Sequence, residues 1–407
     1  MIEATQLASI ATRRRSELFA ADVAASQSPL QEKIGGKAIL VIGGAGSIGS
    51  NTIKEISRFK PARLHVVDQN ENNLAELVRD LRNSDLDPSV ALRALPIDFG
   101  STIMRRFLRE ENARYDFVLN FAALKHVRSE KDAHSLLQMI ETNVIKPGRL
   151  LQWLVDGGHS DNYFCVSTDK AANPVNLMGA SKRLMELHAF GLRPRETMRV
   201  TSARFANVAF SDGSLLYSFQ HRLNKHQPLA APTGTQRYFV SLRESGQICL
   251  LASILAQPQH ILIPRLDPAS DLHLLEEIAT AYLKLNSLAP KVYEDECEAS
   301  ANVERDFAAG QYPLLLTPLD TSGEKPYEEF VGAGERAEEV GMRNLQAVPF
   351  HASQQSLDHL RSFTQIVEAA LNDPIAPFDK TLAIRAISQI LPEFAHIETG
   401  KMLDERR

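Results

Sequence analysis

Short apolar runs alternate with helical patterns over the first half of the chain. The run AILVI at 38–42 is followed by glycines and has no polar alternation, which is expected of a strand that is buried on both faces of a parallel sheet. Helices are predicted between the runs, from about Ile48 and at 74–82, 102–111 and 135–155. Strands and helices that alternate at this spacing predict an α/β fold with a doubly wound parallel sheet and right-handed crossovers. The six predicted strands cover residues 37–43, 63–68, 91–98, 115–123, 162–168 and 198–205.

The regularity breaks after Asn207. Residues 211–350 mix turn residues and basic residues with short apolar segments, which predicts a smaller substrate-binding lobe with parts of the chain returning to the core. Within it, residues 300–350 are rich in Gly, Glu and Pro and are expected to form loops around one short strand, PLLLTPL. The tail, 351–407, is predicted to be helical, because two of its segments place apolar residues at three- and four-residue spacing.

Composition narrows the function classes. The chain has 407 residues, of which 44% are apolar and 23% charged, as in soluble globular proteins. A net charge of −5 gives no general attraction to nucleic acid, so no nucleic-acid partner is expected. No apolar run approaches the roughly 18 residues that a membrane span needs. Cys165, Cys249 and Cys297 have neither close pairing nor metal-ligand spacing, which predicts reduced thiols in a cytoplasmic protein without a metal site.

The N-terminal extension, 1–36, carries a basic cluster at Arg13–Arg15. The stretch after it, SELFAADVAASQS, contains two acids and several serines, which makes a poor signal-peptide core. An amphipathic helix on the surface or in an oligomer contact is the preferred interpretation, and a homo-oligomer is expected.

A glycine-rich turn follows the first predicted strand and opens a domain expected at 37–210. Gly43, Gly46 and Gly49 lead into a helix that begins near Ser47 and Ile48. A Cβ at the glycines would block the tight turn, the approach of a pyrophosphate or the packing of helix on strand. The helix N-terminus offers free N–H groups to a phosphate. A glycine turn that binds nothing is the alternative, but the position between strand and helix favours a Rossmann-like dinucleotide site.

Asp68 and Asp98 stand at the C-terminal ends of the second and third predicted strands. A carboxylate at Asp68 can accept hydrogen bonds from the adenosine ribose hydroxyls and would repel a 2′-phosphate. The residues after it, QNENN, provide no cation, which favours NAD over NADP. Asp98, at the end of the third strand, could reach the adenine amino group. An equally favoured interpretation is that Asp98 is the N-cap of the helix that follows.

Five segments occur in an order that resembles a known family: GGAGSIGS, NFAALKHV, ETNVIKPG, STDKAANPVNLMGASKR and RYFVSLRES. The chain resembles the UDP-N-acetylglucosamine 4,6-dehydratases of bacterial polysaccharide biosynthesis, which are extended short-chain dehydrogenase/reductases. The resemblance covers roughly residues 37–330. It implies a bound NAD that takes a hydride from C4 of the sugar, loss of water across C5 and C6, and return of the hydride to C6.

The resemblance also implies roles in that cycle. Asp169 and Lys170 follow the fifth strand, where a protonated Asp169 would help the C6 hydroxyl leave and a desolvated Lys170 would take the C5 proton. The alternative is that Asp169 and Lys170 form an ion pair on the surface without a catalytic role. Many relatives have a tyrosine four residues before the helical lysine, but Met178 stands four residues before Lys182 here, as in some members of the family. Lys182, Thr168 or a water is then left to take the O4 proton, and core packing is a second interpretation of Met178.

Other positions are assigned through the same resemblance. Asn143 is expected to steady the catalytic segment. For Lys125 and His126 a surface role competes with lining the site. The predicted cofactor contacts are Gly43, Gly46, Ser47, Ile48, Gly49, Asp68, Asp98, Ala122, Ala123, Lys125, Asn143, Ser167 and Lys182. The predicted UDP-sugar contacts are Lys125, His126, Asn207, Ser214 and Arg237, since a diphosphate needs a cation.

Two other functions compete. A UDP-sugar C4- or C5-epimerase shares the 4-keto intermediate but needs no acid–base pair at C5 and C6, so the adjacent Asp169 and Lys170 count against it. A non-catalytic NAD-binding scaffold is favoured by Met178 and opposed by the intact lysines.

Overall fold

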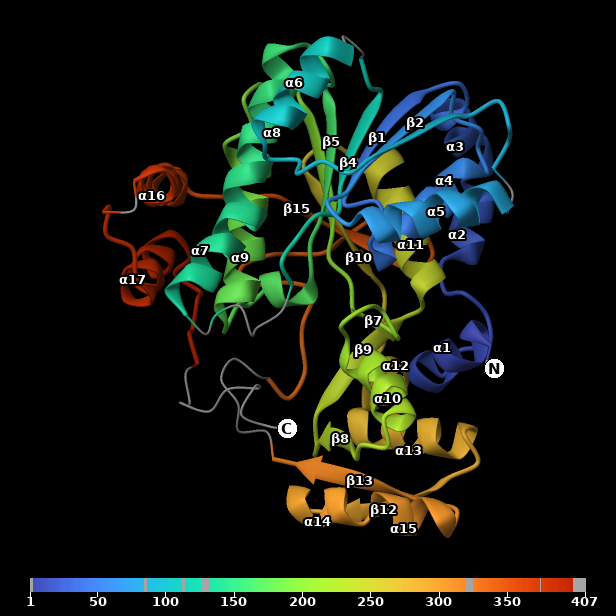
Figure 1. Ribbon diagram of the computed structural model, residues 1–407. Coiled ribbons are helices and arrows are strands. Elements are labelled where there is room, and N and C mark those ends of the chain that lie inside the picture. Colours follow the sequence, from blue (N-terminus) through green and yellow to red (C-terminus); the bar gives the residue numbers. More distant parts are fainter. Residues whose placement is uncertain are drawn as a thin grey trace.

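A nine-stranded sheet forms the centre of the molecule (Figure 1). The structure is a computed structural model that describes residues 3–83, 86–111, 114–125, 130, 132–318, 325–373 and 375–397. The strands lie in the order β14-β15-β10-β6-β5-β4-β1-β2-β3. Their bounds are β1 Ala38–Ile42, β2 Arg63–Val67, β3 Ala91–Leu95, β4 Phe117–Asn120, β5 Asn162–Val166, β6 Arg199–Ala203, β10 His260–Pro264, β14 Glu338–Glu339 and β15 Leu345–Pro349.

The sheet is parallel from β3 to β10 and ends in two antiparallel strands, β15 and β14. The six strands predicted from apolar runs are β1 to β6, and all lie in the parallel part, so the predicted doubly wound fold is confirmed. Strand order reverses at β1, which has β2 on one side and β4 on the other. In such sheets a ligand crevice lies at the carboxyl ends of the strands beside this switch point.

Helices cover both faces of the sheet (Figure 1). Side chains of β1 alternate: Ile39 and Val41 join the core under α4, α5 and α11, whereas Leu40 and Ile42 join the core under α6, α8 and α9. The helix bounds are α4 Ser47–Ser57, α5 Glu71–Asn83, α6 Thr102–Glu111, α7 Ala133–Ile140, the π-helical turn η2 Glu141–Ile145, α8 Lys146–Asp156, the 3₁₀ turn η3 Asp169–Ala171, α9 Leu177–Glu186, the π-helical turn η4 Leu187–Gly191 and α11 Leu242–Ile254.

A small lobe lies beyond the carboxyl edge of the main sheet (Figure 1). It contains two three-stranded sheets, β11-β9-β7 and β12-β13-β8, with a hydrophobic core of its own. Its strands are β7 Asn207–Val208, β8 Leu229–Pro232, β9 Gln236–Val240, β11 Leu272–Leu274, β12 Ala289–Tyr293 and β13 Gln311–Thr317. Its helices are α10 Leu215–Asn224, α12 Pro268–Asp271, α13 Leu275–Leu285, α14 Glu296–Ala301 and α15 Val303–Ala308.

Residues 300–350 contain more structure than the expected loops around one strand. The expected strand is β13, but α15 precedes it, and β15 adds a buried antiparallel strand to the main sheet beside β10. The expectation was wrong for β15 because a five-residue stretch, LQAVP, becomes a strand only through its long-range partner.

The N-terminal extension packs against both cores. Its helices are α1 Ala4–Thr12, α2 Ala20–Ala25 and α3 Gln27–Ile34. Leu7 and Ala11 join the core of the small lobe, whereas α3 contributes to the core of the main sheet. Between the helices, Arg14 forms ion pairs with Glu244 at 2.7 Å and Asp271 at 3.1 Å. The extension is therefore an integrated part of the fold, which a surface helix would not be.

The C-terminal tail is helical, as predicted. Helices α16 (Gln354–Asn372) and α17 (Lys380–Ile390) form a hairpin on the outer side of α7 and α9 (Figure 1). Leu360, Phe363 and Ile387 are buried in one cluster with Met178 of α9. In the part of the chain that the structure describes, no helix is both long enough and apolar enough to cross a bilayer.

Candidate active site

Gly43 and Gly46 between β1 and α4, and Gly49 in the first turn of α4, have different reasons to lack a side chain. A Cβ on Gly43, whose φ is +67°, would lie 2.5 Å from the backbone nitrogen of Ala122. A Cβ on Gly49 would lie 2.5 Å from the carbonyl oxygen of Gly43. At Gly46 the nearest atom is 3.5 Å away, so the protein's own packing does not require glycine there. Gly46 instead leaves space at the N-terminus of α4, which fits the approach of a pyrophosphate.

The small lobe contacts this turn at Ser47. The backbone N–H of Asp212 donates to Ser47 Oγ at 3.1 Å, and Ser47 Oγ donates to Asp212 Oδ2 at 3.0 Å. Lys125, after β4, donates from Nζ to the carbonyl oxygen of Asp212 at 2.9 Å. Ser47 and Ile48 form the first turn of α4, so their amides lie at the helix N-terminus.

Asp68 lies beside the glycine turn at the end of β2. Its Oδ2 accepts a hydrogen bond from the backbone N–H of Ala45 at 3.0 Å, and its Oδ1 accepts one from Asn70 at 3.0 Å. Each carboxylate oxygen can accept a second hydrogen bond. The half-buried side chain is thus held where two vicinal hydroxyls of a ribose could reach it.

Asp98 is held by a lysine rather than used as a helix cap. Its Oδ2 lies 2.7 Å from Lys146 Nζ, and its Oδ1 accepts from the backbone N–H of Gly100. The hydroxyl of Ser101 accepts from Met104 N and caps α6, so the N-cap alternative for Asp98 was wrong. Contact of Asp98 with an adenine stays a prediction.

Asn143 joins three segments of the site. It lies in the π-helical turn η2 and is fully buried. Its side chain accepts from Leu124 N and donates to Leu124 O, each at 2.9 Å, and it donates to Ser181 Oγ of α9 at 2.9 Å. Asn143 therefore fixes the segment after β4, which includes Ala122 and Ala123, relative to α9. His126 lies outside the described residues.

The predicted catalytic segment, residues 167–183, begins where β5 ends. Thr168 Oγ donates to Asp169 Oδ1 at 2.8 Å, and Lys170 Nζ lies 3.1 Å from the same oxygen. Asp169 is 2% exposed, and its Oδ2 is buried without a hydrogen-bond partner among the residues that the structure describes. An unpaired buried carboxyl oxygen is costly, so this atom is suited to a hydrogen bond with a substrate hydroxyl. Because Asp169 is buried and only Lys170 is partly exposed, the surface ion-pair alternative does not describe this pair.

Lys182 is a buried amine in α9. Its Nζ contacts Met185 Sδ at 3.2 Å. Burial lowers the pKa of Lys182 to about 8, although Cys165 and Glu186 oppose that shift. Met178, one turn earlier, is 4% exposed and packs against the C-terminal helices. A desolvated amine with a weak thioether partner fits a group that hydrogen-bonds ribose hydroxyls when a dinucleotide is bound.

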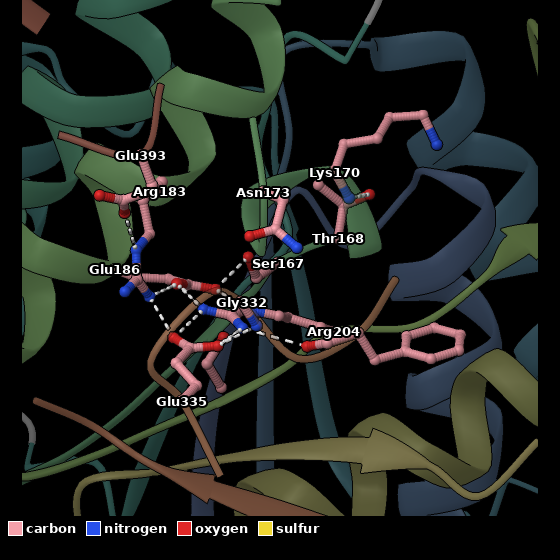
Figure 2. A network of polar contacts seen from close by, with 12 residues as sticks. Ser167, Thr168, Lys170, Asn173, Arg183, Glu186, Arg204, Gly332, Glu335 and Glu393 are labelled. Atoms are coloured by element: carbon pink, nitrogen blue, oxygen red, sulfur yellow. Dashed lines mark hydrogen bonds and ion pairs between the residues drawn. The ribbon is translucent and has the colours of Figure 1, made fainter. Parts of the chain in front are cut away.

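A buried ion network lies behind this segment (Figure 2). Ser167 Oγ donates to Glu186 Oε1 at 2.6 Å, and Arg204, which follows β6, donates to Glu186 Oε2 at 2.6 Å. Arg204 also donates to Glu335 Oε1 at 3.0 Å, and Arg183 bridges Glu186 and Glu335. Burial alone would raise the pKa of Glu186, but Arg204 and Arg183 hold it down to about 2. The network ties the end of β5, α9 and the 325–335 loop into one unit.

The 325–335 loop lies on the catalytic segment. Lys325 Nζ donates to the carbonyl oxygen of Asn173, and Asn173 Oδ1 accepts from Ala333 N at 2.8 Å. A Cβ on Gly332 would lie 2.4 Å from the carbonyl oxygen of Ala172, so the two backbones approach closely. The loop also places Glu328, which is 4% exposed, with Oε1 3.9 Å from Lys170 Nζ.

Three of the five predicted UDP-sugar contacts, Asn207, Ser214 and Arg237, lie in the small lobe and have structural partners. Arg237 Nη1 donates to the carbonyl oxygens of Lys325 and Pro326 at 3.0 and 3.1 Å, which joins β9 to the 325–335 loop. Ser214 caps α10 by accepting from Tyr217 N. Asn207 lies in β7, with Nδ2 3.5 Å from Tyr238 O. Arg237 thus contacts the loop that carries Glu328, and the substrate roles of all three residues stay predictions.

Four charged residues of the site were not predicted from the sequence: Glu186, Arg204, Glu328 and Glu335. Glu186 lies one turn after Lys182 on the same helix, and Arg204 directly follows β6. These two positions, beside a predicted site residue and at the end of a predicted strand, could therefore have been identified from the sequence. Glu328 and Glu335 stand in a charged segment, EKPYEEFVGAGE, that is typical of solvated surface. Their burial depends on the catalytic segment that the loop covers.

Known proteins are similar over most of the chain. It is 32% identical over 260 residues to an uncharacterized membrane protein of Methanocaldococcus jannaschii, covering 63% of this chain and 72% of that one. It is 26% identical to the UDP-N-acetylglucosamine 4,6-dehydratase (inverting) of Campylobacter jejuni, covering 60% and 71%. It is also 26% identical to the UDP-glucose 4-epimerase of Rickettsia typhi, covering 72% and 87%.

Some relatives are much longer. The alignment with the probable polysaccharide biosynthesis protein EpsC of Bacillus subtilis, 27% identical, covers 77% of this chain but 48% of EpsC. Among solved structures, Pen from Bacillus thuringiensis superposes with a TM-score of 0.62 at 20% identity, covering 78% of this chain and 88% of Pen. That similarity supports the fold. The family model described as "Polysaccharide biosynthesis protein" matches residues 39–349. The chain therefore belongs to the polysaccharide biosynthesis protein family.

Proposed function

We propose that the protein is an NAD-dependent nucleotide-sugar 4,6-dehydratase that converts UDP-N-acetylglucosamine to a UDP-4-keto-6-deoxy sugar. The observation that carries the proposal is the ion pair of Lys170 with Asp169, whose carboxyl group is buried at the end of β5 and has one oxygen without a hydrogen-bond partner among the described residues. The dehydratase named among the relatives supports the reaction class, and the resemblance of the motifs supports the substrate.

The chain's own residues fit the cofactor. NAD, when bound, supplies the hydride chemistry by accepting one hydride and giving it back. The space at Gly46 and the first amides of α4 would hold its pyrophosphate. Asp68 would accept hydrogen bonds from the adenosine ribose, and Lys182 would donate to the nicotinamide ribose.

The catalytic segment supplies the proton transfers. Lys170 takes the C5 proton, which the neighbouring 4-ketone acidifies, and the carboxyl group beside it gives a proton to the C6 hydroxyl as water leaves. Met178 has no proton to give, so the O4 proton passes to Lys182, Thr168 or a water. Arg237 would pair with the diphosphate.

An epimerase is the second candidate, because UDP-glucose 4-epimerases are among the relatives. Such an enzyme moves a hydride at C4 and eliminates nothing. The acid–base pair of the buried Asp169 and the neighbouring Lys170, in addition to Lys182, favours the dehydratase.

The test is incubation with UDP-N-acetylglucosamine followed by mass spectrometry. A dehydratase gives a product lighter by one water, an epimerase gives an isomer of unchanged mass, and a scaffold gives no product. The Lys170→Ala variant should bind NAD and UDP normally and still oxidise C4, so reduced cofactor accumulates while turnover falls by roughly 10²–10⁴-fold. Lys284→Ala, which removes an exposed lysine of α13, is the matched control. Near-normal turnover of folded Lys170→Ala would remove Lys170 from the mechanism.

A further inference from the structure

Two buried carboxyl groups converge on one ammonium group in the catalytic segment. Lys170 Nζ lies 3.1 Å from Asp169 Oδ1 and 3.9 Å from Glu328 Oε1. Asp169 is 2% exposed and Glu328 is 4% exposed. Glu328 comes from the 325–335 loop, so folding brings it to a pair that is adjacent in sequence. Like charges that face each other in a desolvated site cannot both ionise freely.

The two carboxyl groups have different surroundings. Asp169 Oδ1 accepts hydrogen bonds from Thr168 Oγ, Lys170 N and Lys170 Nζ, all of which favour the ionised form. Glu328 has ion-pair contacts that exceed hydrogen-bond distance, 3.9 Å to Lys170 and 3.8 Å to Lys325. Hydrogen bonding therefore stabilises the charge of Asp169 more than that of Glu328.

Together, the burial and the charges around Glu328 also disfavour its ionised form. Burial raises the pKa of Glu328, and the neighbouring Asp169 raises it further. Lys170, Arg237 and Lys325 lower that pKa, but burial prevails. Where two neighbouring carboxyl groups have proton affinities that are pushed apart, the one with the higher affinity is the acid.

We propose that Asp169 and Glu328 hold one proton between them across Lys170, that Glu328 is the group that carries it, and that this carboxyl pair is the acid for the departing C6 hydroxyl. The proposal rests on the proposed function, since it assigns the acid of that reaction. It extends the catalytic site to a residue of the 325–335 loop.

The proton balance closes over one turnover. Oxidation at C4 releases the O4 proton to the protein. Before the elimination the Lys170 ammonium group passes one proton to the carboxyl pair, which leaves a neutral amine. The C5–H bond then breaks, its proton goes to that amine, and its electron pair forms the C5–C6 double bond. The C6–O bond breaks as the carboxyl O–H gives its proton to the leaving oxygen, which departs as water. Lys170 returns its proton to C5 when the hydride reaches C6, and the O4 proton restores the Lys170 ammonium group.

Substrate binding should raise the proton affinity of Glu328. Arg237 and Lys325 are cations that oppose protonation of Glu328, and Arg237 is the proposed partner of the diphosphate. A bound diphosphate adds negative charge beside Arg237 and offsets its field at Glu328. Binding of UDP is therefore expected to be accompanied by proton uptake, which can be measured without turnover.

The first experiment is calorimetric titration of the NAD-loaded protein with UDP at pH 7 in two buffers of different ionisation enthalpy. The wild type should take up a fraction of a proton per site. Glu328→Gln, which keeps the shape, should abolish the uptake, whereas Glu328→Asp should restore part of it. Glu329→Gln removes the same charge from an exposed neighbour and is the matched control. Unchanged uptake in Glu328→Gln overturns the proposal.

The second experiment follows turnover of UDP-N-acetylglucosamine. Glu328→Gln should bind substrate and oxidise C4, so reduced cofactor accumulates, while dehydration falls by roughly 10²–10⁴-fold. In the wild type kcat should fall at alkaline pH, because the shared proton is lost. In Glu328→Gln this alkaline decrease in the pH profile of kcat should be missing or displaced to lower pH. Dehydration within a few-fold of that of Glu329→Gln would refute the catalytic role. Absence of a dehydrated product from the wild type would instead refute the proposed function, and calorimetry would still decide whether the proton is shared.

Discussion

The backbone N–H of Ile397 donates a hydrogen bond to the carbonyl oxygen of Val175 at 2.9 Å. Two residues earlier, the N–H of Ala395 donates to the carbonyl oxygen of Pro174 at 3.2 Å. Pro174 and Val175 lie between Lys170 and α9, so the C-terminal tail is hydrogen-bonded to the catalytic segment itself. The tail also reaches the buried ion network, because Glu393 lies 3.5 Å from Arg183.

The tail should support catalysis through this contact. Ile397→Pro removes the N–H donor, whereas Ile397→Ala keeps it and removes only the side chain. A single intramolecular hydrogen bond contributes about 0.5–1.5 kcal/mol, so Ile397→Pro should lower kcat by roughly twofold to tenfold with little change in melting temperature. Equal kcat values for the two variants would show that this hydrogen bond does not position the segment.

Substitutions in the glycine turn should separate binding from folding. Gly46→Ala should melt close to the wild type, because the added Cβ meets no atom closer than 3.5 Å, yet it should weaken NAD binding by about tenfold or more. Gly49→Ala should lower the melting temperature, because its Cβ would lie 2.5 Å from the carbonyl oxygen of Gly43. Calorimetric titration and thermal melts check both. Full NAD affinity in Gly46→Ala would place the pyrophosphate elsewhere.

Asp68 should set the preference for NAD over NADP. Its carboxylate is fixed beside the glycine turn by Ala45 N, where it would repel a 2′-phosphate. Asp68→Ala should weaken NAD binding and reduce the ratio of the affinity for NAD to the affinity for NADP. Titration with each cofactor measures both affinities. Glu71→Ala, an exposed acid at the start of α5, is the control and should keep the ratio. Tighter binding of NADP than of NAD by the wild type would contradict the prediction.

Met178 should supply shape rather than a proton. It packs among the apolar residues of the C-terminal helices, and Met-to-Leu exchanges in cores usually cost less than about 1.5 kcal/mol. Met178→Leu should therefore retain activity within a few-fold, whereas Lys182→Ala should lose it. A loss in Met178→Leu as complete as that in Lys182→Ala would assign Met178 a chemical role.

Lys182 should lower the stability of the free protein. Burial lowers its pKa from 10.5 to about 8, so the unfolded chain binds this proton more tightly than the native protein. The destabilisation is complete below pH 8 and fades as pH rises toward 10.5. Lys182→Met should raise the unfolding free energy at pH 7 by about 1–3 kcal/mol, since one pKa unit corresponds to about 1.4 kcal/mol. Urea denaturation at pH 7 and pH 10 checks this, and a less stable variant at pH 7 would contradict it.

The sequence alone determined the parallel half of the fold and the centre of the candidate site. Strand β1 could be predicted because it is a short apolar run, and burial on both faces leaves that signal in a single strand. Strands β2 to β6 could be predicted from their regular alternation with helical patterns, since some of them, such as RVTSA of β6, are less apolar. The glycine turn, Asp68, Asp169 and Lys170 could be found because each directly follows such a strand. Carboxyl ends of parallel strands share one edge, so local position was enough to bring these residues together.

The tertiary structure decided which charged residues belong to that site. Glu328, Glu335 and Arg204 carry side chains that are common on solvated surfaces, and they are buried only because segments far apart in sequence face each other. The pairing of β15 with β10 and of the tail with Val175 depends in the same way on a distant partner. The free energy of a buried charge is set by the groups around it, and those groups are defined only when the chain has folded.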